Sequence, residues 1–176
     1  ERDDDQAFDA GSVLIFSGAD GALVRRLTDP EGSSSDRFGR SVAGLPDVNG
    51  DDVPDVLAGA PFADTDELND AGVALVLSGA DGSVVRRLEN PEPAFSDELG
   101  TSVAALGDVS GDGAPDYLVG VPQAESVEES DVGKVLLFSV EADCDGDGVS
   151  PFAGDCDDGE NAAYEGNAEV CDGVDN

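Results

Sequence analysis

The chain is short, strongly acidic and free of histidine, and these properties exclude several classes of protein. It has 176 residues, enough for one domain or for a domain with an appendage. Its 41 Asp and Glu residues outnumber 8 Lys and Arg residues, and the net charge of −33 would repel nucleic acid or an anionic membrane surface. The absence of His removes the commonest acid–base catalyst and transition-metal ligand. No apolar run approaches the roughly 18 residues of a membrane span, so we expect no membrane insertion.

Composition alone leaves two explanations of the acidity open. A high-salt habitat favours acidic surfaces, whereas a cation-binding protein uses its carboxylates as ligands. Many of the Asp residues recur at every second position inside loops that contain Gly. A general pressure for solubility would not produce that spacing, so the pattern favours cation binding without excluding the other explanation.

An internal sequence repeat organises the range 1–140. Ser17-Gly18-Ala19-Asp20-Gly21 recurs at 78–82, Phe38-Gly39 is matched by Leu99-Gly100, and three Asp residues of one loop recur in a second loop. The separation is the same for every matched pair, so the period holds without a gap. A regular period of this kind is typical of stacked structural units.

Short apolar runs bounded by turn residues divide each repeat into strands. In chain order, 11–28 supplies two strands, the middle unit supplies four, and 99–139 supplies three. The four runs of the middle unit are 41–45, 55–60, 72–77 and 83–88. Their length and the Asp-Gly and Asn-Gly turns between them favour antiparallel hairpins. The runs 13–16 and 73–77 are apolar throughout, so we expect them to be covered on both faces.

A four-stranded antiparallel unit that stacks on its neighbours is typical of a β-propeller blade. The sequence therefore predicts an all-β fold, with propeller blades over 1–140 and a small irregular segment after them. The expected division is a partial blade 1–37, a full blade 38–98, a partial blade 99–140 and a C-terminal segment 141–176. Because propellers close with about 4–8 blades, we expect the chain to be part of a longer polypeptide, with any export signal removed or upstream of Glu1.

Two Asp-rich loops occupy the same place in successive repeats. The first, 47–55, reads Asp-Val-Asn-Gly-Asp-Asp-Val-Pro-Asp, and the second, 108–116, reads Asp-Val-Ser-Gly-Asp-Gly-Ala-Pro-Asp. Oxygen side chains at positions 1, 3, 5 and 9, with the carbonyl of position 7, suit a hard cation, and calcium tolerates such irregular geometry better than magnesium does. An Asp/Gly-rich turn without metal is the alternative, which two aligned copies disfavour. The loops are not EF-hands, because Ala58 and Val119 replace the Glu of position 12.

These loops and their flanks resemble the FG-GAP repeat of integrin α-subunits and of many bacterial surface proteins. The matching residues are Phe38–Ala43, the loop, and Asp55–Pro61, and the second copy departs slightly with Leu99-Gly100 and Gly120-Val121-Pro122. The resemblance implies a propeller with calcium in the loop between the first two strands of a blade. It implies these ligands: Asp47, Asn49, Asp51, Val53 (carbonyl), Asp55, Asp108, Ser110, Asp112, Ala114 (carbonyl) and Asp116.

Two details of these loops lead to further expectations. Asp52 stands where the repeat usually has Gly, so we expect a left-handed backbone conformation there. Ser110 is a weaker ligand than Asp or Asn, so we expect the second site to bind calcium less tightly than the first.

The composition after Val140 changes to Asp, Gly, Cys and Asn. This segment contains all three Cys residues, and an odd number suggests one local disulfide and a partner beyond Asn176, in oxidising surroundings. With little core, such a segment needs metal or disulfides to hold a shape; a disordered acidic linker is the alternative. Alternating carboxylates predict further calcium ligands at Asp143, Asp145, Asp147, Asp155 and Asp157.

This segment resembles a Cys/Asp-rich metal-binding motif of secreted bacterial proteins of the myxobacterial type. In that motif Val-Cys-Asp-Gly-Val-Asp-Asn continues into Asp-Cys-Asp, so the resemblance implies that the chain stops within the motif. It also implies a pairing of Cys156 with Cys171, which leaves Cys144 for the absent fourth Cys. Because His and Met are absent, the carboxylates indicate calcium and not copper.

The sequence predicts a non-enzymatic, secreted or cell-surface module. Calcium would be structural, and a loop face of the propeller would bind a protein or a glycan. One alternative is a scaffold of a secreted hydrolase or lyase whose catalytic domain lies outside the chain. Another is a purely structural stalk with the acidic segment as a spacer.

Overall fold

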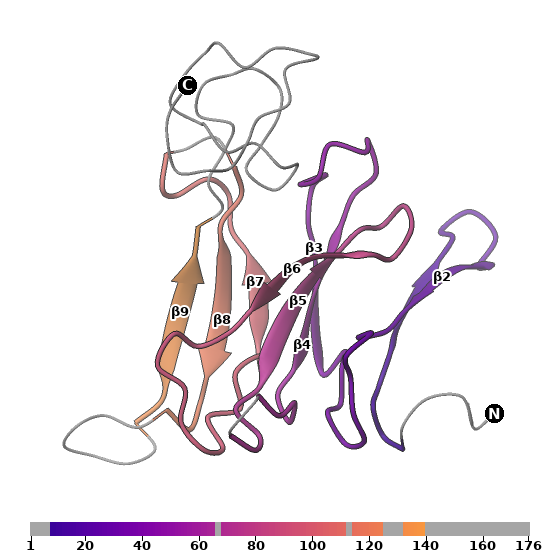
Figure 1. Cartoon of the computed structure of the whole chain (residues 1–176). Helices are drawn as coiled ribbons and strands as arrows, with labels where there is room; N and C mark the ends of the chain where they lie inside the picture. Colours follow the sequence, from indigo (N-terminus) through magenta and orange to yellow (C-terminus); the bar gives the residue numbers. More distant parts are fainter. Residues whose placement is uncertain (1–7, 66–67, 112–113, 125–131, 140–176) are drawn as a thin grey trace, which may run out of the picture.

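A computed structural model of the chain describes residues 8–65, 68–111, 114–124 and 132–139 (Figure 1). Over these ranges it contains nine strands and no helix. Accordingly, the described residues include no helix long and apolar enough to span a membrane. The predicted C-terminal segment 141–176, with its three Cys residues and five proposed ligands, lies outside the described residues.

The strands form three antiparallel sheets that stand side by side (Figure 1). Their orders are β1-β2, β3-β4-β5-β6 and β7-β8-β9. The strands, in chain order, are β1 (Val13–Phe16), β2 (Leu23–Leu27), β3 (Ser41–Gly44), β4 (Val56–Ala60), β5 (Val73–Leu77), β6 (Val84–Leu88), β7 (Val103–Ala105), β8 (Tyr117–Val121) and β9 (Lys134–Phe138). The predicted two, four and three strands are confirmed, and so is the all-β fold of four-stranded antiparallel blades.

The strand registers repeat with the period of the sequence. Val42 pairs with Ala58 in the second sheet, and their counterparts one period later, Val103 and Val119, pair in the third. The β1–β2 hairpin and the β5–β6 hairpin also share a register and a bulge near the end of the first strand. Equal registers put equivalent side chains on equivalent faces, so the three sheets are copies of one structural unit.

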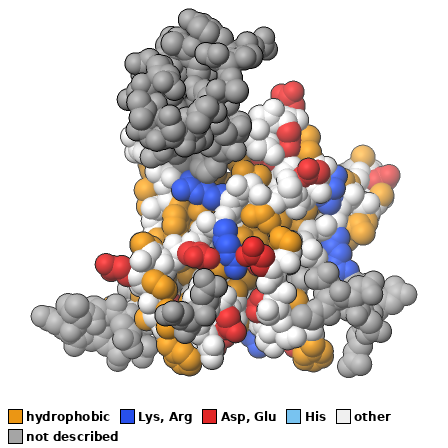
Figure 2. Space-filling model, viewed as in Figure 1, with side chains coloured by type: hydrophobic (Ala, Val, Ile, Leu, Met, Phe, Trp, Pro, Cys, Tyr) orange, Lys and Arg blue, Asp and Glu red, His pale blue; other side chains and the backbone are white. Residues whose placement is uncertain are grey.

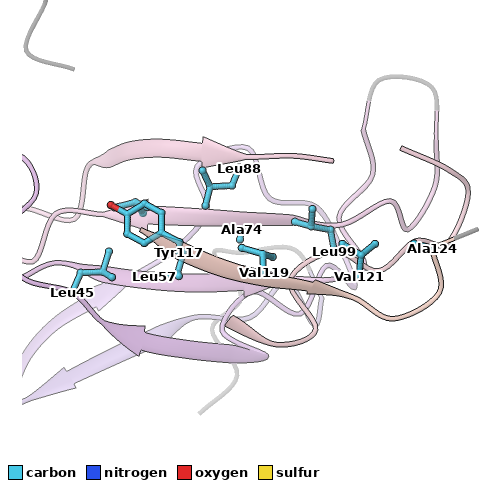
Figure 3. Packing of buried hydrophobic residues seen from close by; sticks show 10 residues of the cluster. Leu45, Leu57, Ala74, Leu88, Leu99, Tyr117, Val119, Val121 and Ala124 are labelled. Carbon is cyan, nitrogen blue, oxygen red and sulfur yellow. The ribbon is translucent and has the colours of Figure 1, made fainter. Parts of the chain in front are cut away.

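The second sheet lies between its two neighbours, and its central strands β4 and β5 are largely buried. On one face Leu57, Ala74 and Val76 pack with Tyr117 and Val119 of the third sheet (Figure 3). On the other face the core contains Leu27 from the first repeat and Phe38 from the start of the second, together with Ala58, Leu75 and Leu77. All five residues of β5 are buried, as expected for a strand covered on both faces.

We also expected β1 to be covered on both faces, and this prediction is wrong. Leu14 and Phe16 are 47% and 57% exposed, whereas Val13 and Ile15 pack against the core. The reason is that a strand is covered twice only when a sheet lies on each side. Among the described residues, β1 has a neighbouring sheet on one side alone. Val135 and Leu137 of β9 are exposed for the same reason at the other end of the stack.

Charged groups also connect the repeats at the end of the sheets away from the Asp-rich loops. The Arg87 guanidinium lies 3.2 Å from buried Asp29, 3.4 Å from Glu31 and 3.0 Å from Glu89. These three contacts surround one arginine with carboxylates, so the adjoining hollow is acidic and unsuited to an anion. Figure 2 likewise shows isolated basic side chains placed among acidic and apolar ones on the visible face.

One pair of positions differs between the copies at this end of the sheets. Asn90 donates a hydrogen bond of 2.6 Å from Nδ2 to a carboxylate oxygen of buried Asp97. The equivalent pair one repeat earlier is Asp29 and Asp36, two carboxylates. Burial raises the pKa of Asp36, and the charges of Asp29 and Asp64 add to that effect. In the first copy the positive charge of Arg87 offsets the negative charge of Asp29. In the second copy the amide of Asn90 is uncharged and donates a hydrogen bond to Asp97 instead.

Candidate functional site

The first Asp-rich loop connects β3 to β4 and is closed at its base by backbone hydrogen bonds. Leu45 N–H donates to the carbonyl of Asp55 at 2.8 Å, and Asp55 N–H donates to the carbonyl of Pro46 at 3.3 Å. The loop backbone turns through left-handed conformations at Gly50 (φ 79°) and Asp52 (φ 66°). The expectation for Asp52 is confirmed. Asp is one of the few residues other than Gly that enter this region readily.

Asp47 organises the tip of the first loop. One oxygen, Oδ1, accepts hydrogen bonds from the N–H groups of Asn49, Gly50 and Asp51 at 2.8–3.2 Å, and Oδ2 accepts one from Asp52 at 2.6 Å. A single carboxylate thus gathers four successive N–H groups. These four hydrogen bonds curl the tip of the loop around the Asp47 carboxylate.

Asp51 connects the loop to a neighbouring turn. Its Oδ1 accepts from Val53 N–H at 2.8 Å, and its Oδ2 accepts from Asn49 Nδ2 and from Ser78 Oγ, each at 2.9 Å. The bond from Asn49, then that from Ser78, keeps the pKa of Asp51 below its ordinary value. These hydrogen bonds favour the charged form of Asp51, which is the form that binds a cation.

Asp55 is buried behind the loop. It is 1% exposed, and it accepts hydrogen bonds from Val48 N–H at 2.8 Å and from Gly79 N–H at 3.0 Å. Burial nevertheless raises its pKa, and the charges of Asp51 and Asp47 raise it further. The charges of Asp51 and Asp47 therefore disfavour the charged form of Asp55, and a cation among these carboxylates would relieve that repulsion.

The second loop, between β7 and β8, repeats this arrangement in part. Leu106 N–H donates to the carbonyl of Asp116 at 2.8 Å, as Leu45 does to Asp55. Buried Asp116 accepts from the N–H groups of Val109 and Ser110 at 2.7 and 2.9 Å. Asp108 Oδ1 accepts from Gly111 N–H at 2.5 Å. Asp112 lies outside the described residues, and half-buried Ala114 adjoins the apolar core.

The described ligands of each set lie in one loop, as predicted. Their side chains do not form a closed coordination sphere. Within the described ranges, no three acidic side chains are arranged closely enough to hold a metal ion. The reason is visible in the first loop, where the carboxylates of Asp47 and Asp51 are turned to backbone N–H groups and to Ser78. Both side chains belong to loop residues with access to solvent, so rotation about their side-chain bonds can redirect an oxygen.

Comparison with known proteins identifies this part of the chain. Residues 38–77, which span β3, the first Asp-rich loop, β4 and β5, match the FG-GAP repeat. The chain contains an FG-GAP repeat. The identical registers of the third sheet extend the same unit to the second loop.

Curated relatives show the same resemblance over most of the chain. It is 30% identical to integrin alpha-2 of Mus musculus over 142 residues, and 33% identical to integrin alpha-8 of Mus musculus over 135 residues, each covering 73% of the chain. Integrin alpha pat-2 of Caenorhabditis briggsae is 32% identical over 120 residues, or 64% of the chain. The chain spans only 10–12% of the length of these relatives.

The donor set of the FG-GAP loop fits a hard cation. The side chains that the resemblance implies as ligands offer only oxygen, from carboxylates and the amide of Asn49 in the first loop. Sulfur or imidazole ligands, which would favour zinc or copper, are absent from both loops. Oxygen donors on an irregular loop suit calcium.

Sequence reasoning missed the part that the turn 78–82 plays in this site. Ser78 and Gly79 contact two of the proposed ligands, yet they belong to the connection between β5 and β6. A sequence signal did exist. The string Ser-Gly-Ala-Asp-Gly recurs with the same period as the Asp-rich loop, which indicates that the two segments serve one structural unit.

Proposed function

We propose that this chain is a calcium-stabilised FG-GAP module of an extracellular or cell-surface protein, with a role in recognition. The observation that carries the proposal is the placement of two Asp-rich loops. They occupy the same connection, between the first two strands, in two sheets with equal registers. A structural cation stabilises each repeat at the same position, whereas a catalytic ion would be expected at one active site. The repeated loops therefore favour a structural role.

In the first loop Asp47, Asn49, Asp51, Asp55 and the carbonyl of Val53 would hold the ion. In the second, the corresponding residues are Asp108, Ser110, Asp112, Asp116 and the carbonyl of Ala114. Calcium would supply positive charge that neutralises the carboxylates. The chain itself fixes the loop through the buried carboxylate of Asp55, which accepts hydrogen bonds from both the loop and the turn 78–82.

Recognition and location rest on the similarity to integrin α-subunits. That similarity supports a protein ligand, and a glycan is the alternative ligand that the sequence leaves open. It also supports a non-enzymatic role, which agrees with the lack of His for acid–base catalysis. We extend the proposal to 141–176, where alternating carboxylates would bind further calcium and Cys156 would pair with Cys171.

Thermal unfolding in calcium and in chelator tests this function. Extracellular modules bind calcium with dissociation constants of about 10⁻⁴–10⁻³ M. At about 10 mM calcium each site then adds about 1.4–2.7 kcal/mol to the free energy of unfolding. For a chain of this size, that corresponds to a rise of the melting temperature by about 3–10 °C per site.

Magnesium at the same concentration is the matched control. It screens the negative charge equally well, but it fits an irregular oxygen site poorly. We expect a clearly smaller rise in magnesium than in calcium. Equal melting temperatures in calcium, magnesium and chelator would contradict a structural calcium site.

A further inference from the structure

The turn 78–82 lies between the first Asp-rich loop and the preceding repeat. Toward the loop, Ser78 Oγ donates to Asp51 and Gly79 N–H donates to Asp55. The backbones are in close contact as well, because a Cβ on Gly79 would lie 1.9 Å from the carbonyl oxygen of Pro54. The position of this turn therefore sets the position of two proposed ligands.

On its other side the turn contacts β2 of the preceding repeat through hydrogen bonds and packing. Arg25 Nε donates to the carbonyl of Gly79 at 3.2 Å, and Arg25 Nη2 donates to the carbonyl of Ala80. A Cβ on Gly82 would lie 3.1 Å from Leu27 Cδ2 and 3.7 Å from Arg25 Cδ. One guanidinium thus holds two successive carbonyl groups while the apolar part of β2 packs on the end of the turn.

A similar arginine contact occurs one repeat later. Arg86 is the counterpart of Arg25 one period later, and Ser139 is the counterpart of Ser78. Arg86 Nη1 donates to the carbonyl of Ser139 at 3.3 Å. In both copies an arginine of the outer strand donates to a backbone carbonyl just after the third strand of the following sheet, although the two contacts differ by one residue.

We propose that Arg25 is a positioning residue for the calcium site in the loop 47–55. It holds the turn 78–82, the turn holds Asp51 and Asp55, and calcium affinity in one repeat therefore depends on a side chain of the repeat before it. This inference rests on the proposed calcium binding. It adds that cation binding and the contact between repeats are coupled.

Charge and positioning predict opposite effects of Arg25. A cation next to a calcium site repels the ion, so an arginine that acted only through its charge would weaken binding. A forked donor that fixes two carbonyl groups strengthens binding by holding the ligands in place. Lysine retains the charge but not the planar fork, and glutamine removes the charge. The two substitutions together separate the effects.

The test is a calcium titration of the full chain by two-dimensional amide NMR. The Gly50 resonance reports the first loop, and the Gly111 resonance reports the second. We expect Arg25→Lys and Arg25→Gln each to weaken calcium binding in the first loop about 10-fold, the lower end of the effect of residues that orient metal ligands. Binding in the second loop should not change. Arg26→Gln, at the neighbouring position on the opposite face of β2, is the matched control and should leave both loops unchanged.

The outcomes are distinct. If Arg25→Gln strengthens binding in the first loop while Arg25→Lys leaves it unchanged, Arg25 acts by charge and the inference is wrong. If all variants bind as the parent chain does, the inference is also wrong although calcium binding stands. If the parent chain shows no calcium-dependent shift at Gly50, the proposed function itself fails. The Gly111 resonance in each sample shows whether the variant is folded.

Discussion

Replacing Gly59 by alanine is expected to destabilise the chain by about 3 kcal/mol or more, at the upper end of the cost of overpacking. Gly59 lies in β4 and faces the segment that leads into β7 of the third sheet. A Cβ there would lie 2.0 Å from the carbonyl oxygen of Gly100 and 2.7 Å from Ser41 Oγ. The carbonyl is backbone and cannot rotate away, so the two sheets would have to separate.

The separation would also break a hydrogen bond between the two repeats. Ser41 Oγ donates to the Gly100 carbonyl at 2.7 Å. Urea unfolding of the two chains measures the loss. We expect a lower midpoint for the variant, with a similar dependence on urea if the folded state is retained.

Gly44→Ala is the matched control for this substitution. Gly44 also lies in a strand of the second sheet, but a Cβ there would meet nothing within 4 Å. Alanine should stabilise that position by about 0.5–1 kcal/mol, because glycine loses more backbone entropy on folding. Equal effects of the two substitutions would show that the sheets do not pack as closely as the structure has them.

Replacing Asp55 by asparagine is expected to have a large effect that depends on calcium. Asp55 accepts hydrogen bonds from Val48 N–H and Gly79 N–H, and an amide can accept only one of them in the same orientation. An unsatisfied buried donor costs about 1–3 kcal/mol. Asparagine carries no charge, however, and burial raises the pKa of Asp55 above its ordinary value of 3.8. The two effects offset each other in part when calcium is absent.

With calcium the variant loses the stabilisation by the ion as well. In chelator we therefore expect a loss of about 1 kcal/mol, and at about 10 mM calcium a loss of about 2.4–3.7 kcal/mol. Unfolding by urea in the two buffers measures the difference. The same loss in both buffers would mean that Asp55 has only a structural role.

Asp52→Asn is the control that removes one negative charge from the same loop. Asp52 is not among the proposed ligands. Asparagine readily adopts the left-handed conformation of this position. We expect little change in stability in either buffer. This result would assign the effect at Asp55 to its place in the loop and not to the net charge.

The sequence predicted the strands well because the signals for them are local and repeated. The constant period, the strand-length apolar runs and the turn residues each indicate the same boundaries. The structure shortens the predicted runs by one residue at an end, for example from 41–45 to Ser41–Gly44. The two-sided burial of β5 was also predictable, because its five residues are all apolar.

The parts that could not be predicted depend on which neighbour each element has. Val13–Phe16 is as apolar as β5, but half of its side chains are exposed because a second covering sheet is absent from the described residues. The sequence likewise does not show that Asp55 is buried whereas Asp51 is exposed. The contact of Arg25 with Gly79 joins residues 54 positions apart, and only the packing of two repeats brings them together.

Calcium titration by isothermal calorimetry tests the central claim most directly, that each of the two loops binds one calcium ion. The chain is compared with a variant in which Asp47, Asp51, Asp108 and Asp112 are all replaced by Asn. Any sites in 141–176 are the same in both chains, so the difference reports the loops. We predict that the variant binds two fewer calcium ions per chain. An unchanged number of ions bound, with an unchanged affinity, would contradict calcium binding by these loops.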